Sequence, residues 1–223
     1  MPSQPDDSKA NTKLQKYPRK GAEILKAAER IFAKKGFQSA TISDIAKKAK
    51  VSEATIYEYF SSKEELLFAI PAQTIRDYHE KNSEILPYIQ GAANKLSFLI
   101  KRHLGLYADN PDYANVVMLN LKVNRNFIKT EAYRIVQSSA TKYIQVLKEG
   151  IDSGEFRPDV NPYLVRSMIW GTIEHTVTRK SMLGKPDNLV SLADDICNTI
   201  FAGIRSLENN PGIHVNVTLQ KDT

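Results

Sequence analysis

The stretch TIYEYFSSKEELL, residues 55–67, combines hydroxyl, aromatic and cationic side chains that could bind phosphate groups. If the stretch begins as a helix, Tyr59 and Phe60 fall on its inner side and Tyr57 points outward. An exposed tyrosine hydroxyl can donate to a phosphate of DNA. A lysine at a helix start, such as Lys63, can hold a phosphate beside the free backbone N–H groups. The pattern favours a nucleic-acid contact over the alternative, an exposed Tyr57 without a partner.

Four neighbouring side chains could add to this contact. Thr41 and Ser52 each stand at a predicted helix start, where a hydroxyl caps the helix and lies near any bound phosphate. For Thr41 the capping role alone would explain the residue. Ala54 could place its methyl group against a thymine methyl, and Thr55 could reach a base edge. The predicted DNA contacts are therefore Thr41, Ser52, Ala54, Thr55, Tyr57 and Lys63.

The charge distribution also indicates a polyanionic partner. The 223-residue chain has a net charge of +6. Residues 1–64 hold 13 Lys or Arg against 8 Asp or Glu, which leaves 18 against 17 for the rest of the chain. A basic segment beside a nearly neutral one is typical of a nucleic-acid-binding part. A chance accumulation of surface lysines is the alternative.

Three short helices should position these residues. The first is expected over residues 18–36, and a capping box of Thr41 and Asp44 opens the second. Ser52 caps the third. A tight turn at Lys50 joins the second and third helices. This is a helix-turn-helix unit, whose third helix would enter the major groove of DNA.

The remainder of the chain predicts an all-α fold of about nine helices in total. Pro71 lies inside the fourth helix, where it removes a backbone hydrogen bond and is expected to cause a kink. Near the C-terminus, alternating apolar residues predict either a short strand or a frayed end. The expected helices from the fourth onward are 63–84, 91–109, 111–123, 130–153, 160–183 and 187–207.

Composition places the protein in the cytoplasm. The single cysteine, Cys197, excludes an internal disulfide and fits a reducing compartment. No basic start followed by an apolar block indicates a secretory signal. No apolar run approaches the roughly 18–20 residues of a membrane span. We therefore expect a soluble protein without a membrane partner.

The residue patterns argue against catalysis and metal binding. His175 directly follows Glu174, but adjacent residues of a helix diverge by about 100°, so they do not share a site. His103 likewise has no partner at a metal-ligand spacing. The chain contains no HExxH, paired CxxC, GxSxG or P-loop pattern. We predict neither an enzyme nor a bound metal or cofactor.

The segment GFQSATISDIAKKAKVSEATIYEYFSSKEELL, residues 36–67, resembles the DNA-binding signature of TetR-type transcriptional regulators. The resemblance implies an all-α homodimer that binds a palindromic operator, usually as a repressor. It also implies release of DNA when a small molecule fills the C-terminal domain. Lys50 departs from the pattern, because the family commonly has glycine in this turn. The matching residues are Gly36, Phe37, Thr41, Ile45, Ala46, Val51, Ser52, Thr55, Tyr57, Tyr59, Phe60, Lys63 and Glu64.

The same resemblance implies four parts of the chain. Residues 1–17 would be a flexible basic arm, and residues 18–70 the helix-turn-helix domain. Residues 71–207 would bind the effector and form the dimer, and residues 208–223 would be a tail. A second segment, residues 150–183, looks like FadR-like members of the family, which control fatty-acid degradation and respond to long-chain acyl-CoA.

Large apolar side chains of the C-terminal part could together line the effector pocket, although each taken singly is better explained as core. The pocket candidates are Phe98, Tyr107, Met118, Leu121, Phe127, Met168 and Trp170. The last two helices are expected to pair with their copies in a four-helix seam. The candidates for that interface are Thr172, Leu183, Leu192, Ile196, Ile200 and Ile204.

The sequence thus predicts a ligand-responsive repressor that binds double-stranded DNA as a homodimer, with long-chain acyl-CoA as the suspected effector. A regulator of drug efflux in the same family is the first alternative. Acidic residues and stacked aromatic rings in the pocket would favour a cationic drug, whereas basic groups at its mouth would favour acyl-CoA. An all-α interaction module or an enzyme that does not bind DNA is the second. Binding to promoter DNA would separate the second alternative from the other two.

Overall fold

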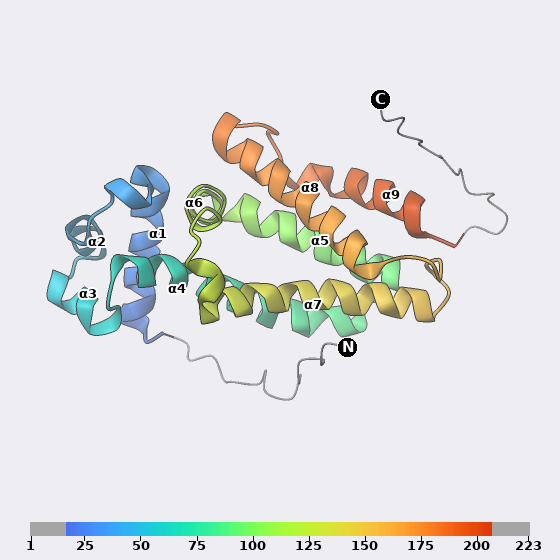
Figure 1. Ribbon diagram of the computed structural model, residues 1–223, viewed down its shortest axis with the longest axis horizontal. Helices are drawn as coiled ribbons and strands as arrows, with labels where there is room; N and C mark the ends of the chain where they lie inside the picture. The colour runs from blue at the N-terminus through green and yellow to red at the C-terminus, as the bar shows by residue number, and fades with distance from the viewer. Residues whose placement is uncertain (1–16, 207–223) are drawn as a thin grey trace, which may run out of the picture.

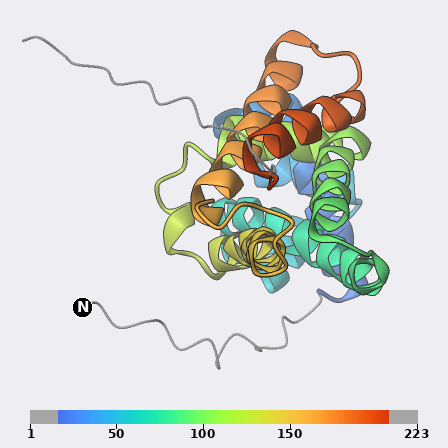
Figure 2. The ribbon, with the colours of Figure 1, turned by 90° about the vertical axis from the view of Figure 1, so that its right-hand side faces the viewer.

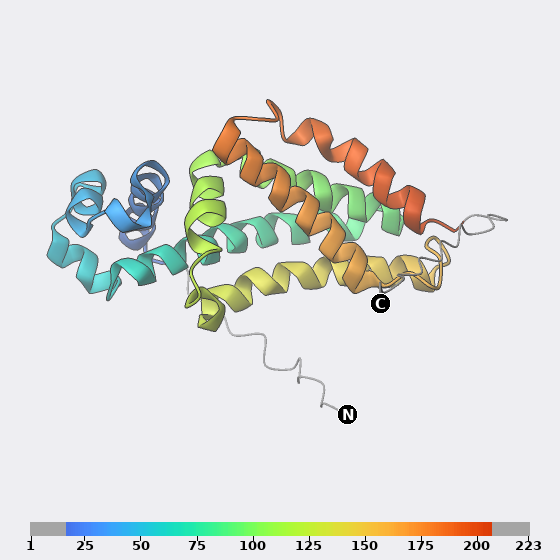
Figure 3. The ribbon, with the colours of Figure 1, turned by 45° about the horizontal axis from the view of Figure 1, so that its top comes forward.

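A computed structural model describes residues 17–206, apart from the side chain of His79. This part of the chain forms nine α-helices and four shorter helical turns (Figure 1), which confirms the expected all-α fold. A cluster of three helices at the N-terminal end adjoins a larger bundle (Figures 1 and 3). The expected basic arm up to residue 16 and the alternating segment near the C-terminus lie outside the described residues.

The N-terminal cluster consists of α1 (Arg19–Ser39), α2 (Ile42–Ala49) and α3 (Glu53–Tyr59). Gly36 is the one residue of α1 with non-helical angles, at φ 74°, and it marks the predicted end of the first helix. Apolar side chains at helical spacing on the three helices meet in a common core. Its most buried members include Ile24, Phe32, Ile45, Ile56 and Phe60.

Hydroxyl caps fix where α2 and α3 begin. The N–H of Asp44 donates to Thr41 Oγ1, and the N–H of Thr41 donates to Asp44 Oδ2, both over 3.1 Å. The predicted capping box is therefore present. At α3, Ser52 Oγ accepts from the N–H of Thr55 over 3.0 Å, as expected for an N-cap.

Lys50 adopts a left-handed conformation in the turn between α2 and α3, with φ 57° and ψ 46°. Its N–H donates back to Ala46 O and Lys47 O, which closes α2. A side chain with a Cβ is strained in this region, whereas glycine is not. The turn therefore has the geometry for which the family commonly uses glycine.

Lys63 connects the start of α4 (Lys63–Ile85) to the end of α1. Its Nζ donates to the carbonyl oxygens of Phe37, Gln38 and Ala40 over 2.8, 3.3 and 2.8 Å. The ammonium also lies 4.6 Å from the centre of the Phe37 ring. A cation at the carbonyl end of a helix is electrostatically favourable. Lys63 thus holds the start of α4 against the end of α1.

The larger bundle is built around α4, which extends from the N-terminal cluster along the molecule (Figure 3). Pro71 does not end this helix, although it has no N–H to donate. Figure 2 views the bundle from one end. The remaining helices are α5 (Ala92–Asp109), α6 (Pro111–Val116), α7 (Glu131–Asp152), α8 (Pro162–Leu183) and α9 (Ala193–Ile204). The short turns are η2 (Leu86–Tyr88), η3 (Val117–Leu121, a π-helical turn), η4 (Phe127–Lys129) and η5 (Val190–Leu192).

The left-handed turn gives a first prediction. Lys50→Gly should raise the free energy of unfolding by about 1 kcal/mol, because it relieves the strain of a side chain at positive φ. The same change at Lys47, inside α2, should lower it by about 1 kcal/mol. Thermal denaturation followed by circular dichroism measures both. A decrease in stability for Lys50→Gly would contradict the strain argument.

The lysine between α1 and α4 gives a second prediction. Lys63→Met keeps the aliphatic stem but leaves three carbonyl oxygens without their donor, so we expect a loss of about 2 kcal/mol of stability. Lys48→Met removes an exposed charge from α2 and should change stability little. Urea denaturation of the two variants tests this. Equal stabilities would show that the three hydrogen bonds contribute nothing net.

Candidate DNA-binding face and ligand cavity

The outer face of α2 and α3 carries most of the residues predicted to contact DNA. Tyr57 is 54% exposed, and Ser52 and Ala54 are exposed at the start of α3. Thr55 is half-buried, and its hydroxyl lies 2.9 Å from that of Ser52. In contrast, Tyr59 is half-buried and Phe60 is buried in the core. The adjacent aromatic side chains therefore divide between an outer and an inner face, as their helical spacing predicts.

Thr41 belongs to a hydrogen-bonded network at the start of α2. Its hydroxyl donates to Asp44 Oδ2 over 2.9 Å, and Lys35 Nζ donates to Asp44 Oδ1 over 2.6 Å. The bond from Lys35 and then those from Thr41 lower the pKa of the Asp44 carboxyl to about 2. Thr41 is exposed, but its side chain is already engaged in fixing this helix start.

Lys63 is placed differently from its predicted role. Its ammonium has three N–H groups, and all three carbonyl contacts of Lys63 lie within the protein. The phosphate contact expected from its position at a helix start is therefore not open to it in this conformation. The exposed cations nearest to α3 along the chain are Lys47, Lys48 and Lys50, at and just after the end of α2.

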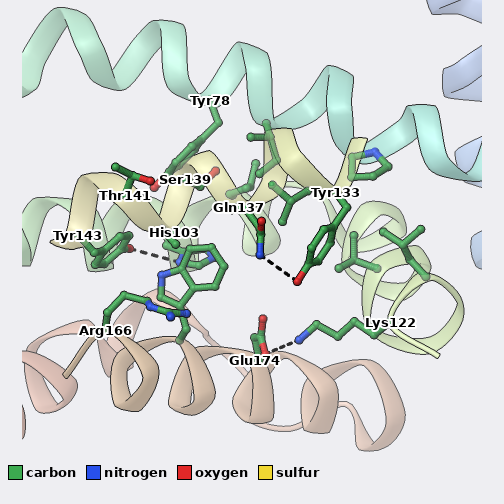
Figure 4. A pocket seen from close by; sticks show the side chains of 18 of the residues that line it. Tyr78, His103, Lys122, Tyr133, Gln137, Ser139, Thr141, Tyr143, Arg166 and Glu174 are labelled. Atoms are coloured by element: carbon green, nitrogen blue, oxygen red, sulfur yellow. Dashed lines mark hydrogen bonds and ion pairs between the residues drawn. The ribbon is translucent and has the colours of Figure 1, made fainter. Parts of the chain in front are cut away.

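The bundle encloses a cavity of about 1010 Å³ between α4, α5, α7, α8 and the segment that follows α6 (Figure 4). Four of the seven predicted pocket residues line it: Tyr107, Leu121, Phe127 and Trp170. The other three do not. Phe98 and Met118 pack elsewhere in the core, and Met168 is 52% exposed on the outer side of α8.

Aromatic and polar side chains that the sequence did not assign to the pocket supply much of its wall. Tyr78 from α4 and Arg166 and Glu174 from α8 approach it from opposite sides (Figure 4). His103 packs against several of these rings, at 5.5 Å from Tyr107 and 5.2 Å from Trp170 between ring centres. The i,i+4 spacing of His103 and Tyr107 was a usable signal, because it places both on one face of α5. The unassigned aromatic lining residues are Tyr78, His103, Tyr113, Tyr133, Tyr143 and Tyr163.

His103 is a neutral, hydrogen-bonded group of this wall. Burial, and then the charge of Lys122, lower its pKa to about 4. Tyr143 Oη donates to Leu99 O over 2.9 Å and lies 3.3 Å from His103 Nδ1. Since the tyrosine hydrogen is used on Leu99, the Nδ1 atom of His103 must carry the hydrogen of the second contact. Such an arrangement is a satisfied core histidine rather than a metal ligand.

Of the four charged residues that line the cavity, two form an ion pair with each other and two do not. Lys122 and Glu174 form an ion pair (Figure 4). Lys148 on α7 and Arg166 on α8 also line the cavity, and neither forms an ion pair with a carboxylate of the described residues. Their cations lie near aromatic rings, Lys148 Nζ at 6.0 Å from Tyr163 and Arg166 Cζ at 5.9 Å from Trp170. The cavity therefore carries a surplus of positive charge.

The segment from η3 to η4 joins the cavity to the N-terminal cluster. Asn120 Oδ1 accepts a hydrogen bond of 2.8 Å from the backbone N–H of Phe37. Phe37 directly follows the non-helical residue Gly36 near the end of α1. Asn124 and Asn126 each donate a side-chain N–H to Glu64 Oε1 on α4, over 3.0 and 3.3 Å. The same segment lines the cavity through Val117, Leu121, Lys122, Asn124, Phe127 and Ile128.

Glu29 on α1 lies at the same junction. Burial, and then the negative charge of Asp112 on α6, raise its pKa to about 7, while the charges of Lys26 and Arg30 act in the opposite direction. Since α1 and α6 pack against each other, two carboxylates contribute to one interface between the cluster and the bundle. This junction is therefore electrostatically unfavourable when both are ionised.

The predicted dimer residues separate into two groups. Ile196, Ile200 and Ile204 on α9 are buried within the single chain, so they belong to its own core and not to an exposed face. Leu192 is half-buried, whereas Thr172 and Leu183 on α8 are exposed. The large exposed apolar side chains of α8 also include Tyr163, Leu164, Met168 and Met182.

Residues 17–206 offer neither a cluster of metal ligands nor a membrane-spanning helix. This range contains no group of three or more His, Cys, Asp or Glu side chains that could hold a metal ion. None of the helices in the same range has the length and apolar character required to cross a membrane.

Comparison with known proteins agrees with this architecture. Residues 24–70 match the family described as bacterial regulatory proteins, tetR family, and residues 72–203 match the YsiA-like protein, C-terminal region. The fatty acid metabolism regulator protein of Bacillus subtilis is 31% identical over 192 residues, which cover 86% of this chain and 98% of that protein.

Two solved structures share the whole arrangement. The crystal structure of FadR from Bacillus subtilis in complex with stearoyl-CoA superposes with a TM-score of 0.77 at 31% identity, covering 82% of this chain and 99% of that one. The fatty acid degradation regulator FadR from Bacillus halodurans gives 0.79 at 26% identity, covering 85% and 98%. The chain therefore belongs to the TetR family, with a FadR-like C-terminal region, and it is a DNA-binding transcriptional regulator and not an enzyme.

Proposed function

We propose that this regulator is a repressor that acts in the cytoplasm, binds a palindromic operator as a homodimer, and releases it when a long-chain acyl-CoA fills the cavity. One observation carries the proposal: the segment from Val117 to Ile128 lines the cavity, bonds to α1 of the N-terminal cluster through Asn120, and bonds to the start of α4 through Asn124 and Asn126. A ligand that moves this segment must therefore act on the DNA-binding helices.

On DNA, α3 enters the major groove. Ala54 and Thr55 meet base edges, while Tyr57 donates its hydroxyl to a phosphate. Ser52 and Thr41 lie at helix starts, where backbone N–H groups also attract phosphates. Lys47, Lys48 and Lys50 replace Lys63 as the sources of positive charge, since Lys63 is engaged with carbonyl groups of the protein.

Ligand chemistry follows from the cavity. A volume of about 1010 Å³ holds a large apolar group. The cations of Lys148 and Arg166 lack carboxylate partners among the described residues and would favour the phosphates of CoA. A cationic drug is disfavoured, because the one carboxylate of the wall, Glu174, is already paired with Lys122.

The energy available is sufficient for release. Shifting a population from about 99% to 1% DNA-competent requires about 5.5 kcal/mol of differential affinity. Burial of apolar surface contributes about 25 cal/mol per Å². An acyl chain that buries a few hundred Å² more in the released state than in the DNA-bound state supplies that difference.

The dimer forms through the outer side of α8, with Leu164, Met168, Met182 and Leu183 as apolar contacts. Thr172 lies between them on the same exposed side. The α9 residues Ile196, Ile200 and Ile204 support this surface from within the chain. Pairing two chains would set the two α3 helices about 34–36 Å apart, one turn of DNA.

A third prediction tests the DNA face. Tyr57→Ala should weaken binding to an operator fragment, selected by the protein from a random pool, by about tenfold or more, because each half-site loses a phosphate contact. Tyr88→Ala removes another exposed tyrosine, at the far end of α4, and should leave affinity unchanged. Fluorescence anisotropy with labelled DNA measures both. Equal affinities of the two variants would remove α3 from the proposed interface.

A fourth prediction tests the effector. Palmitoyl-CoA should release the operator from the wild-type dimer, and Ala140→Trp should raise the concentration required by at least about tenfold, because the indole occupies the cavity. Ala108→Trp changes an exposed alanine of α5 outside the cavity and serves as the control. Both variants should still bind DNA without ligand. Failure of palmitoyl-CoA to release the wild-type protein would reject acyl-CoA as effector.

A further inference from the structure

The wall of the cavity contains two buried hydrogen-bond donors without acceptors. Within the described residues, Arg166 Nε and Trp170 Nε1 are shielded from solvent and have no hydrogen-bond partner. A buried donor that lacks an acceptor lowers the stability of the folded protein by about 1–3 kcal/mol, so such donors are rare in native proteins. Both residues line the cavity, so a ligand that displaces the side chains covering these two atoms can supply the missing acceptor.

The two donors are close to each other. Arg166 and Trp170 are four residues apart on α8 and so lie on the same face of the helix. The guanidinium carbon of Arg166 is 5.9 Å from the centre of the Trp170 ring. Both residues line the cavity, and Lys148 lines it from the facing helix α7. Oxygen atoms at the head of a ligand could accept from these donors once the covering side chains move aside.

We propose that Arg166 Nε and Trp170 Nε1 bind the carbonyl-type oxygen at the head of the effector's acyl group, either the thioester carbonyl of an acyl-CoA or the carboxylate of a free fatty acid. The assignment deepens the proposed function and rests on it for the acyl character of the ligand. Hydrogen bonds from an arginine are charge-assisted and therefore stronger than neutral ones. The pair thus selects acyl groups over plain alkyl chains of equal length.

This position fixes the direction of the chain. With the oxygen at Arg166 and Trp170, the phosphates of a CoA group lie towards Lys148. The hydrocarbon then extends past His103 and Tyr107 towards Leu121 and its neighbours in η3. Only a long chain reaches the segment that bonds to Phe37 and Glu64, so chain length determines whether the bound ligand acts on the DNA-binding helices.

The test compares ligands with and without the oxygen on the full-length dimer. Isothermal titration calorimetry would be run with palmitoyl-CoA, with hexadecyl-CoA thioether, which lacks the carbonyl, and with palmitate and hexadecane. We expect the wild-type protein to prefer palmitoyl-CoA over the thioether by about tenfold. Trp170 is the single tryptophan of the chain, so its fluorescence reports the same contact directly.

Matched variants assign the preference to the two donors. Trp170→Phe keeps a ring and loses the N–H, and Arg166→Met loses the guanidinium; each should reduce the thioester preference to about threefold or less. Lys148→Met also removes a cation, but it should weaken both CoA ligands equally and leave the ratio unchanged. A preference that survives both Trp170→Phe and Arg166→Met, or is absent from the wild-type protein, overturns the assignment.

The ligand series also separates this assignment from the proposed function. If palmitate binds in a manner that depends on Arg166 and Trp170 while palmitoyl-CoA does not bind, the subsite is correct and acyl-CoA is not the effector. If both CoA ligands bind equally, acyl-CoA stands and the subsite is rejected. Binding by none of the four compounds rejects both.

Discussion

A hydrogen bond of 2.8 Å joins the N-terminal cluster to the bundle. The backbone N–H of Phe37, at the end of α1, donates to Asn120 Oδ1, beside the cavity. Phe37 follows the non-helical residue Gly36, so its N–H has left the regular pattern of α1 and needs an acceptor from elsewhere. Asn120 sits in the π-helical turn η3, where Val117 and Leu121 line the cavity. In the proposed mechanism, a change in the cavity wall would reach α1 through this side-chain amide.

The cavity combines properties that usually exclude one another. Its aromatic wall suits an apolar ligand, yet it contains a histidine, several tyrosine hydroxyls and two unpaired cations. The low dielectric of the bundle resolves this conflict by holding groups neutral where they are buried, as the depressed pKa of His103 shows. Lys122 and Glu174 form an ion pair, whereas Lys148 and Arg166 have no carboxylate partner among the described residues. If the cavity binds the proposed ligand, these polar groups would discriminate among apolar ligands without making the cavity hydrophilic.

Features set by neighbouring residues could be predicted from the sequence, and contacts between distant helices could not. The Thr41 and Asp44 capping box and the outward position of Tyr57 depend on spacings of a few residues, and the structure contains both. The contacts of Lys63 within the protein could not be predicted, because its three carbonyl partners belong to residues 23 to 26 positions earlier in the chain. The roles of Asn120 and Asn124 were missed for the same reason, since their partners Phe37 and Glu64 are remote in sequence.

The sequence by itself determined the all-α fold, the helix-turn-helix and the family, because helical periodicity, caps and turn residues act over one or two turns. Only the tertiary structure decided what each helix face meets. Met168 and Trp170 are two residues apart on α8, and both are large and apolar, yet one is exposed and the other lines the cavity. Ile196, Ile200 and Ile204 form a regular apolar stripe that is buried against the chain itself. Periodicity identifies the residues that share a face, but the surface opposite that face is set by how the helices pack.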